Sequence, residues 1–383
     1  MSAPPLRIKT LETLLFRAPI AEPLRTSFGV LTSRPALLVR AEDAEGAVGW
    51  GEIWCVFPPC GAEHRAALVD TMLAPIVTGE DWPGPADAYD AMTRRTHIVM
   101  LQGGEPGPLA QAIAGVDIAL WDLAARRAGQ PLWRFLSGDD VRGDGTMPVY
   151  ASGLNPDNPE VIAKARQAEG YTAFKLKIGF GAERDLANLR TLRQALGNDA
   201  QLMADVNQGW DLETALGLCG KLDAFGLTWL EEPLACDRPA DEWLTLANSS
   251  PVLLAAGENL RGDREFDALI KSRTVPYVQP DMTKWGGFSG CLPLARRIIK
   301  AGLTFCPHYL GGAVGLMASA HLLAAAGGNG LLEADANPNP LRERMLLATP
   351  PIREGRMMLT DAPGLGSEPD VAGLQTYRVT DLR

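Results

Sequence analysis

Between residues 147 and 335 the chain alternates short apolar runs with longer amphipathic stretches. The apolar runs are 148–152, 173–178, 202–207, 228–232, 252–258, 277–281, 304–308 and 331–335. In the intervening stretch 183–196, leucines recur with helical spacing and Gly197 follows as a stop signal. This alternation predicts parallel βα units, and their number is that of a (β/α)₈ (TIM) barrel. A doubly wound open sheet also alternates, but it does not place a polar residue at nearly every strand end.

The N-terminal part predicts a smaller α+β domain. Residues 8–54 have strand character, and 37–42 and 47–53 flank a turn typical of a hairpin. Helices are expected at 62–78, at about 84–99 and at 108–127. Gly129 and Pro131 then end the last of them. We divide this α/β chain into an N-terminal α+β domain (1–128), the barrel (129–341) and a C-terminal segment (342–383) that packs back on the first domain.

Composition narrows the class of protein. Hydrophobic residues make up 46% and charged residues 21% of 383 residues, as in a globular protein with a large core. The net charge of −10 argues against nucleic acid and anionic membranes as partners. We find no apolar stretch of bilayer length and no signal peptide in residues 1–10. The six scattered cysteines are typical of reduced thiols in a cytoplasmic protein; pairing of Cys55 with Cys60 is the alternative.

Ionisable residues stand at the C-terminal ends of most of the apolar runs, about 25 residues apart. They are Lys175 and Lys177, Asp205, Glu231, Glu258, Asp281, His308 and Glu333. In a barrel these strand ends meet on the face that carries the active site. Asp205, Glu231 and Glu258 come from consecutive strands, and oxygen ligands of this kind favour Mg²⁺ over zinc. The alternative is that all three are solvated acids.

Two lysines lie two residues apart on the strand AFKLKIG, so both face the barrel mouth. Like charges this close are expected to lower each other's ammonium pKa, which would make Lys177 or Lys175 a base near neutral pH. Exposed lysines at a strand end are the alternative. Lys284, three residues past Asp281, is interpreted as a surface or rim residue.

A second acid–base pair is predicted on neighbouring strands. Asp281 next to His308 would fix the tautomer of the imidazole and raise its basicity. A satisfied core histidine is the alternative interpretation of His308. Glu333 and Asp335 share one face of the last strand, and one of them is a candidate for a hydrogen bond to substrate; a structural role for both is the alternative.

These groups together suit one reaction. A proton next to a carboxylate is too weakly acidic for lysine or histidine alone, and a divalent cation on that carboxylate stabilises the enediolate that forms. A lysine on one face and a histidine on the other can then abstract and return a proton, or abstract one and eliminate.

The ordered motifs resemble the enolase superfamily and, within it, the mandelate racemase group. They are GVDIALWDLAARRAGQPLWRFLSG, KLKIGFG, DVN, WLEEP, GEN, QPD with GGFSG, PH and LLEAD. The resemblance implies a barrel under a capping domain, Mg²⁺ on Asp205, Glu231 and Glu258, and Lys177 as base with Lys175 as its partner. It also implies a second base or acid in the Asp281–His308 dyad, with Glu333 where the racemase has its carboxylate-polarising acid. The muconate-lactonising branch instead has a Lys at the Asp281 position.

The resemblance also points to the substrate, a small-molecule carboxylate of the acid-sugar class. The loops 25–31 and 54–60 of the capping domain would choose it, with Arg25, Phe28, Trp54 and Asn207 as candidate contacts. Several segments resemble galactarolactone cycloisomerases, although the segment after His308, Tyr-Leu-Gly-Gly, departs from them. We expect a homo-oligomer, from dimer to octamer.

Dehydration by β-elimination is the leading hypothesis for the reaction. Racemisation or epimerisation by 1,1-proton transfer and cycloisomerisation of a sugar lactone are the alternatives. A Schiff-base aldolase built on one of the lysines and a binding protein without activity are more remote ones.

Overall fold

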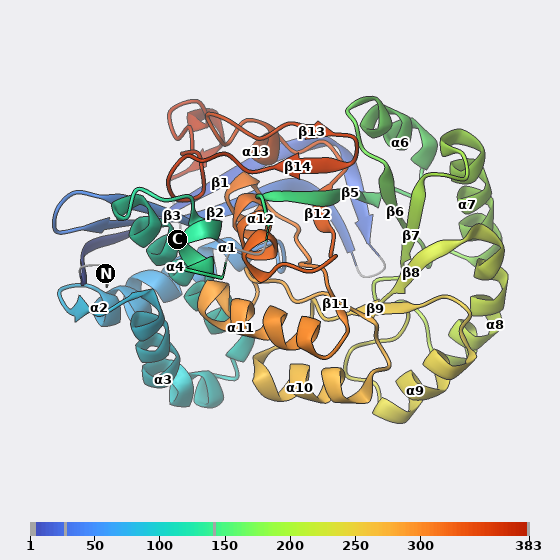
Figure 1. The fold of residues 1–383 in the computed structure, drawn as a ribbon, viewed down its shortest axis with the longest axis horizontal. Helices are drawn as coiled ribbons and strands as arrows, with labels where there is room; N and C mark the ends of the chain where they lie inside the picture. The colour runs from blue at the N-terminus through green and yellow to red at the C-terminus, as the bar shows by residue number, and fades with distance from the viewer. Residues whose placement is uncertain (1–4, 27–28, 141–142, 381–383) are drawn as a thin grey trace.

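A computed structural model describes residues 5–26, 29–140 and 143–380, and its centre is a (β/α) barrel (Figure 1). Hydrogen-bonded neighbours run β11–β10–β9–β8–β7–β6–β5 and then from β5 to β12, all in parallel. The strands are β5 (Thr146–Leu154), β6 (Ala173–Lys177), β7 (Gln201–Asp205), β8 (Leu227–Glu231), β9 (Leu254–Ala256), β10 (Tyr277–Val278), β11 (Thr304–Phe305) and β12 (Leu332–Asp335). The fold class predicted from the sequence is confirmed.

Helices surround the barrel strands on the outside (Figure 1). They are α6 (Pro159–Ala168), α7 (Ala182–Leu196), α8 (Leu212–Leu222), α9 (Ala240–Ser249), α10 (Gly262–Ser272), α11 (Gly287–Lys300) and α12 (Ala313–Ala326). Phe174 and Leu176 point outward from β6 into the core that also holds Leu189 and Leu192 of α7. The leucine stripe therefore packs on the strand, as its spacing predicts.

The inside of the barrel is built in layers. Tyr150, Ala173, Met203, Trp229, Cys306 and Leu331 form a small apolar core between the strands. Inward-facing positions recur every second residue along a strand, so the next inward residue lies one layer higher. Those residues are Ser152, Lys175, Asp205, Glu231, His308 and Glu333. A sealed apolar floor thus lies directly beneath the polar strand ends.

The N-terminal domain is an antiparallel sheet with helices against it. Its strands are β1 (Leu6–Thr26), β2 (Gly29–Asp43), β3 (Val48–Ile53) and β4 (Asp81–Trp82), and its longer helices are α1 (Gly61–Leu68), α3 (Pro85–Gly103) and α4 (Pro106–Arg127). The expected helix 62–78 is α1, a π-helical turn and the short α2 (Ala74–Val77). Gly49 and Gly51 let α4 approach β3: a Cβ on Gly51 would lie 2.1 Å from the Gly115 carbonyl oxygen.

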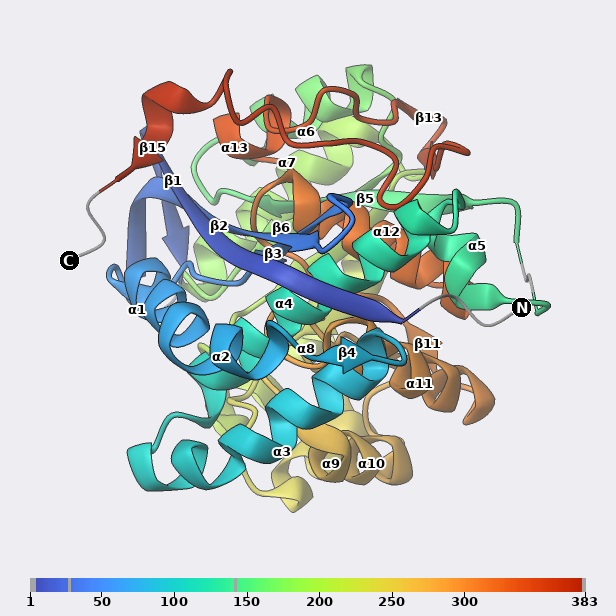
Figure 2. The same ribbon diagram turned by 90° about the vertical axis from the view of Figure 1, so that its left-hand side faces the viewer.

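The end of the chain returns to this domain. After α5 (Leu132–Ser137) at the junction and α13 (Pro340–Glu343) past the barrel, the tail forms β13 (Ile352–Arg353), β14 (Arg356–Met358) and β15 (Arg378–Val379). Strand β14 pairs with β5, and β15 pairs with β1 through Leu15 opposite Val379 (Figure 2).

Buried polar contacts join the N-terminal domain to the barrel. Glu52 on β3 accepts hydrogen bonds from the backbone of Gly312 (2.5 Å) and Gly315 (2.9 Å) at the start of α12. Arg34 on β2 forms a 2.6 Å ion pair with Asp335 on β12, and both side chains are almost fully buried. These contacts anchor the N-terminal domain at the C-terminal ends of the barrel strands.

Helix α4 corrects the expectation that no apolar stretch has bilayer length. Its 22 residues are long and apolar enough to cross a membrane by length and composition, but 89% of the apolar window is buried in the protein. A helix buried between β3 and α11 must be apolar for the same reason as a membrane helix, since neither has water around it.

His321 gives acid sensitivity to the fold. The side chain of His321 on α12 is buried, and its Nδ1 accepts a hydrogen bond from the backbone N–H of Trp133 on α5 (3.0 Å). Burial lowers the pKa of the imidazole to about 3. The unfolded chain takes up this proton near pH 6.5, so stability falls as the pH drops from about 6.5 toward 3. For wild type relative to His321→Gln, we expect an extra loss of roughly 2 kcal/mol between pH 7 and pH 5, measured by urea unfolding. Parallel stability curves for the two proteins would contradict this.

Candidate active site

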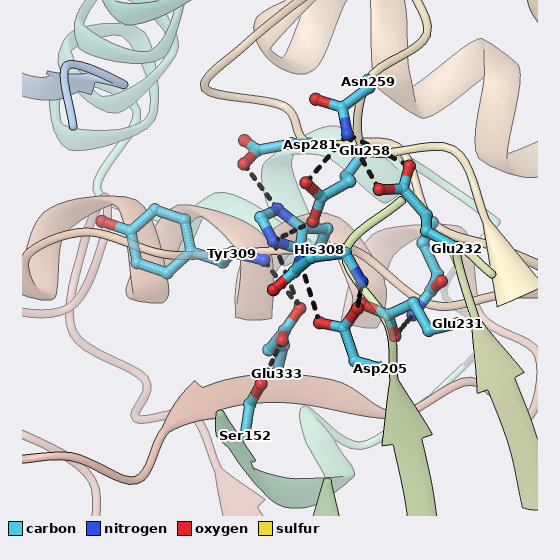
Figure 3. Close-up of polar contacts among 12 residues, drawn as sticks. Ser152, Asp205, Glu231, Glu232, Glu258, Asn259, Asp281, His308, Tyr309 and Glu333 are labelled. Carbon is cyan, nitrogen blue, oxygen red and sulfur yellow. Dashed lines mark hydrogen bonds and ion pairs between the residues drawn. The ribbon is translucent and has the colours of Figure 1, made fainter. Parts of the chain in front are cut away.

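The predicted side chains gather in one polar cluster at the C-terminal ends of the barrel strands (Figure 3). Lys177, Asp205 and Glu231 are direct neighbours across β6, β7 and β8 in the strand register. Glu258, Asp281 and His308 lie two or three residues past β9, β10 and β11, which end earlier than expected. Loops rather than strands therefore carry these three, yet all of them point into the same space.

Asp205 and Glu231 are each held by a lysine and by neutral donors. Lys177 Nζ lies 2.7 Å from Asp205 Oδ2, and the Asn207 backbone N–H donates to Oδ1 at 2.7 Å. Lys175 Nζ lies 2.5 Å from Glu231 Oε1. Trp229 Nε1 (3.0 Å) and Gln279 Nε2 (2.7 Å) donate to Glu231 Oε2. These donors fix both carboxylates in place.

Glu258 bridges two cationic side chains with its two oxygens. His308 Nε2 lies 2.5 Å from Oε2, and Lys284 Nζ lies 3.2 Å from Oε1. Asn259 Nδ2 also donates to Oε1 (3.0 Å), and it donates to the buried Glu232 (2.9 Å). Glu232 thus faces away from Glu231 and supports the loop that carries Glu258.

The donor set fits a divalent cation by charge and by ligand type. Among the described residues no three Asp, Glu, His or Cys side chains stand ready as a coordination group, because lysine and histidine nitrogens lie between the carboxylates. Negative charge nevertheless exceeds positive charge here. The acidic groups of this cluster are Asp205, Glu231, Glu232, Glu258, Asp281 and Glu333, and the basic groups are Lys175, Lys177, Lys284 and His308.

The pKa of Glu231 records that excess. Burial and the charges of Asp205, Glu333 and Glu258 together raise it to about 7, although Lys175 lowers it. Burial, together with Glu258, also raises the pKa of Glu232 well above its usual value. A hard cation relieves this crowding, and carboxylate oxygens are the ligands it takes.

The pKa of neither lysine is lowered overall, which contradicts the prediction. Burial lowers the pKa of Lys177, and so does the charge of Lys175. The charges of Asp205 and Glu258 outweigh both effects and raise this pKa overall. Glu231 and Glu333 likewise raise the pKa of Lys175 well above its usual value, although burial opposes them. The prediction counted the cations and left out the carboxylates that the barrel brings against them.

Their positions separate the two lysines. Lys175 is 1% exposed, and its Nζ lies between Glu231 and Glu333 (2.8 Å) above the Tyr150 ring. Lys177 lies two residues farther along β6, level with Asp205; it is partly exposed and donates to Asn207 Oδ1 (2.5 Å). Lys177 is therefore the lysine that a ligand in the barrel mouth can reach. Lys175 lies deeper and holds the carboxylates of Glu231 and Glu333 in place.

Asp281 and His308 form the predicted dyad, with 2.8 Å between Asp281 Oδ2 and His308 Nδ1. The outer nitrogen, Nε2, faces the site. Burial would lower the pKa of His308, but the charges of Glu258 and Glu333, together with the hydrogen bonds that the ring donates to Asp281 and Glu258, raise it to about 10. The imidazole is protonated in this arrangement, which suits a general acid.

Glu333, and not Asp335, enters the site. It accepts from Ser152 Oγ in a short hydrogen bond and from the Tyr309 backbone N–H at 3.1 Å. Burial would raise its pKa, but Lys175 and His308 lower it to about 2, so Glu333 is ionised. Asp335 instead pairs with Arg34, which the sequence did not indicate.

The remaining candidates divide three ways. Trp54 and Asn207 lie at the site, Asn207 through Lys177 and Trp54 with its ring 4.9 Å from Lys284 Nζ. Arg25 pairs through its backbone with Val30, but its side chain lies outside what the structure describes, as does all of Phe28.

All six cysteines are free, so Cys55 and Cys60 do not pair.

Lys284 is the main correction. It was expected at the surface or rim, but it is 8% exposed and paired with Glu258. Ser152, Gln279 and Asn259 are further site residues that the sequence interpretation missed. Period-two spacing from Tyr150 would have indicated Ser152, and the same spacing between Tyr277 and Asp281 would have indicated Gln279, whereas nothing in the sequence places Asn259.

Fold and site together define a barrel enzyme whose acids and bases come from successive strand ends. The chain belongs to the mandelate racemase/muconate lactonizing enzyme family of the enolase superfamily. Residues 10–137 match the model of that family's N-terminal domain, and residues 160–373 match the enolase C-terminal domain-like model.

Curated relatives include a cycloisomerase and a dehydratase. The D-galactarolactone cycloisomerase of Agrobacterium fabrum is 29% identical over 98% of this chain and 100% of its own length. The L-talarate/galactarate dehydratase of Salmonella typhimurium is 35% identical over 69% of this chain and 64% of its own length. Relatives of this kind make the chain a lyase or isomerase of the superfamily.

Solved structures agree with the family. A mandelate racemase/muconate lactonizing enzyme from Bordetella bronchiseptica RB50 has 51% identity and a TM-score of 0.90, covering 97% of this chain and 99% of the other. A racemase from Streptomyces coelicolor A3(2), solved with bound magnesium, has 27% identity and a TM-score of 0.87, covering 97% of this chain and 100% of the other.

Proposed function

We propose that this protein is a Mg²⁺-dependent acid-sugar dehydratase. The observation that carries the proposal is the placement of Lys177 and the Asp281–His308 dyad around one carboxylate cluster on β7, β8 and the loop after β9. Asp205, Glu231 and Glu258 would hold the cation. The bound cation would supply charge stabilisation for an enediolate formed from the substrate carboxylate.

The residues of the chain account for the proton transfers. Lys177 takes the α-proton, and the C–H electron pair forms the enediolate. The C–O bond to the β-hydroxyl then breaks, and His308 donates its Nε2 proton so that water leaves. The resulting enol tautomerises to a 2-keto-3-deoxy acid. The carboxylate charge of Asp205 that raises the pKa of Lys177 would be shared with a cation bound there. Burial and Lys175 would then lower this pKa, so that Lys177 can act as a base.

A dehydratase relative, the Asp281–His308 dyad and a relative solved with bound magnesium support this proposal. The second candidate is cycloisomerisation of a sugar lactone, because the galactarolactone cycloisomerase matches the chain over its whole length. Both reactions begin with removal of an α-proton and differ in the group that leaves.

A panel of aldonates, aldarates and aldarolactones in D₂O with Mg²⁺ distinguishes the reactions by NMR. We expect a keto acid from at least one open-chain acid sugar. Consumption of a lactone without reaction of open-chain acids would favour the second candidate. Deuterium in recovered substrate without a keto acid would show a racemase or epimerase, and no reaction across the panel would overturn the proposal.

A further inference from the structure

A third lysine lies in the site, and the proposed proton transfers leave it without a role. Lys284 Nζ lies 3.2 Å from Glu258 Oε1, 3.3 Å from Asn259 Oδ1 and 4.9 Å from the centre of the Trp54 ring. Its side chain is 10% exposed. A buried ammonium is costly unless it is paired, so its acceptors decide what it does.

Lys284 is fixed to the same residue that orients His308. Asp281 Oδ1 accepts the backbone N–H groups of Thr283 (2.8 Å) and Lys284 (3.2 Å), while Oδ2 contacts the imidazole. The turn after β10 therefore bends the chain back and points Lys284 into the mouth. One carboxylate thus sets the spacing between the two cationic groups.

Glu258 occupies both cationic groups at once, His308 with one oxygen and Lys284 with the other. Under the proposed function, on which this inference rests, Glu258 is a ligand of the cation. Its charge is then shared with the cation, and His308 and Lys284 both need a new acceptor on the same side of the site. For His308 that acceptor is the leaving hydroxyl.

We propose that Lys284 binds an acceptor oxygen of the substrate beyond the α-carbon. Among the described contacts its remaining partners are the Asn259 amide and the Trp54 ring, and neither carries a negative charge. Asp281 and Glu232 act on the ammonium through their charges, but no described hydrogen bond joins either carboxylate to its Nζ. A substrate oxygen next to the hydroxyl group that His308 protonates would be a suitable acceptor for Lys284. The oxygen belongs to a further hydroxyl or a second carboxylate, so Lys284 selects polyhydroxylated or diacid substrates over simple hydroxy acids.

Calorimetry tests this without turnover, using Lys284→Met, Lys284→Gln and Lys284→Arg. Exposed Lys271 on α10 offers Lys271→Met as the matched control. Mg²⁺ is titrated first, and then tartrate and glycolate are titrated in saturating Mg²⁺. Glycolate has only the carboxylate and α-hydroxyl, whereas tartrate adds oxygens beyond them.

We expect Met and Gln at position 284 to weaken tartrate about tenfold or more and to leave glycolate within about twofold. Mg²⁺ should bind at least as tightly as in wild type, since a competitor for Glu258 is gone. Lys284→Arg should recover part of the tartrate affinity, and Lys271→Met should match wild type.

Two results would overturn the inference. One is unchanged tartrate binding in the Met and Gln variants. The other is an equal loss of Mg²⁺, glycolate and tartrate, which would show that Lys284 only holds Glu258 in place. If the tartrate effect holds while wild type converts no acid sugar, the proposed function fails and the Lys284 contact stands.

Discussion

Lys177→Met and His308→Asn should each lower kcat about 10³-fold or more, with different residual chemistry. Without Lys177 no group on that side removes the α-proton, so neither a keto acid nor deuterium exchange is expected. Without His308 the α-proton still leaves but the hydroxyl is not protonated, so substrate should exchange deuterium while keto acid formation stops. NMR in D₂O on substrate and product measures both.

The assignment has a matched control and a clear failure. Lys271→Met makes the same chemical change on the exposed face of α10 and should keep full activity. Exchange that survives in Lys177→Met but stops in His308→Asn would reverse the two roles. A kcat within about tenfold of wild type for either variant would contradict its part in proton transfer.

Glu231→Gln should weaken Mg²⁺ binding about 100-fold or more, because the neutral amide removes one charged ligand from the cluster. Glu232→Gln is the matched control: the next residue is equally buried but faces Asn259. We expect Glu232→Gln to weaken Mg²⁺ binding by about tenfold at most. Calorimetric titration of Mg²⁺ gives both affinities, and circular dichroism verifies the fold. Equal losses in the two variants, or none in Glu231→Gln, would contradict the ligand assignment.

The barrel and its polar layer were predictable because two periodicities determine them. Alternation of runs and helices gave the βα units, and period-two spacing placed Asp205 and Glu231 directly above Met203 and Trp229. Both facts are local to each strand. The same reasoning predicted that Lys175 and Lys177 share a face.

What the sequence did not reveal depends on contacts between distant segments. Lys284 turns inward because Asp281 accepts the backbone N–H groups of the turn that follows it. Asp335 is excluded from the site by Arg34, which comes from the other domain. The pKa of Lys177 rises because β7 brings Asp205 to its ammonium group, which the spacing of the two lysines alone does not show.

The central claim is that Asp205, Glu231 and Glu258 bind one divalent ion between Lys177 and His308. A crystal grown with Mn²⁺ in place of Mg²⁺ tests it by anomalous diffraction. We predict one strong peak within about 2.2 Å of an oxygen from each of the three carboxylates, with Glu258 turned away from His308. A peak that misses any of these carboxylates, or density that keeps them paired with lysine and histidine under saturating Mn²⁺, would contradict the account.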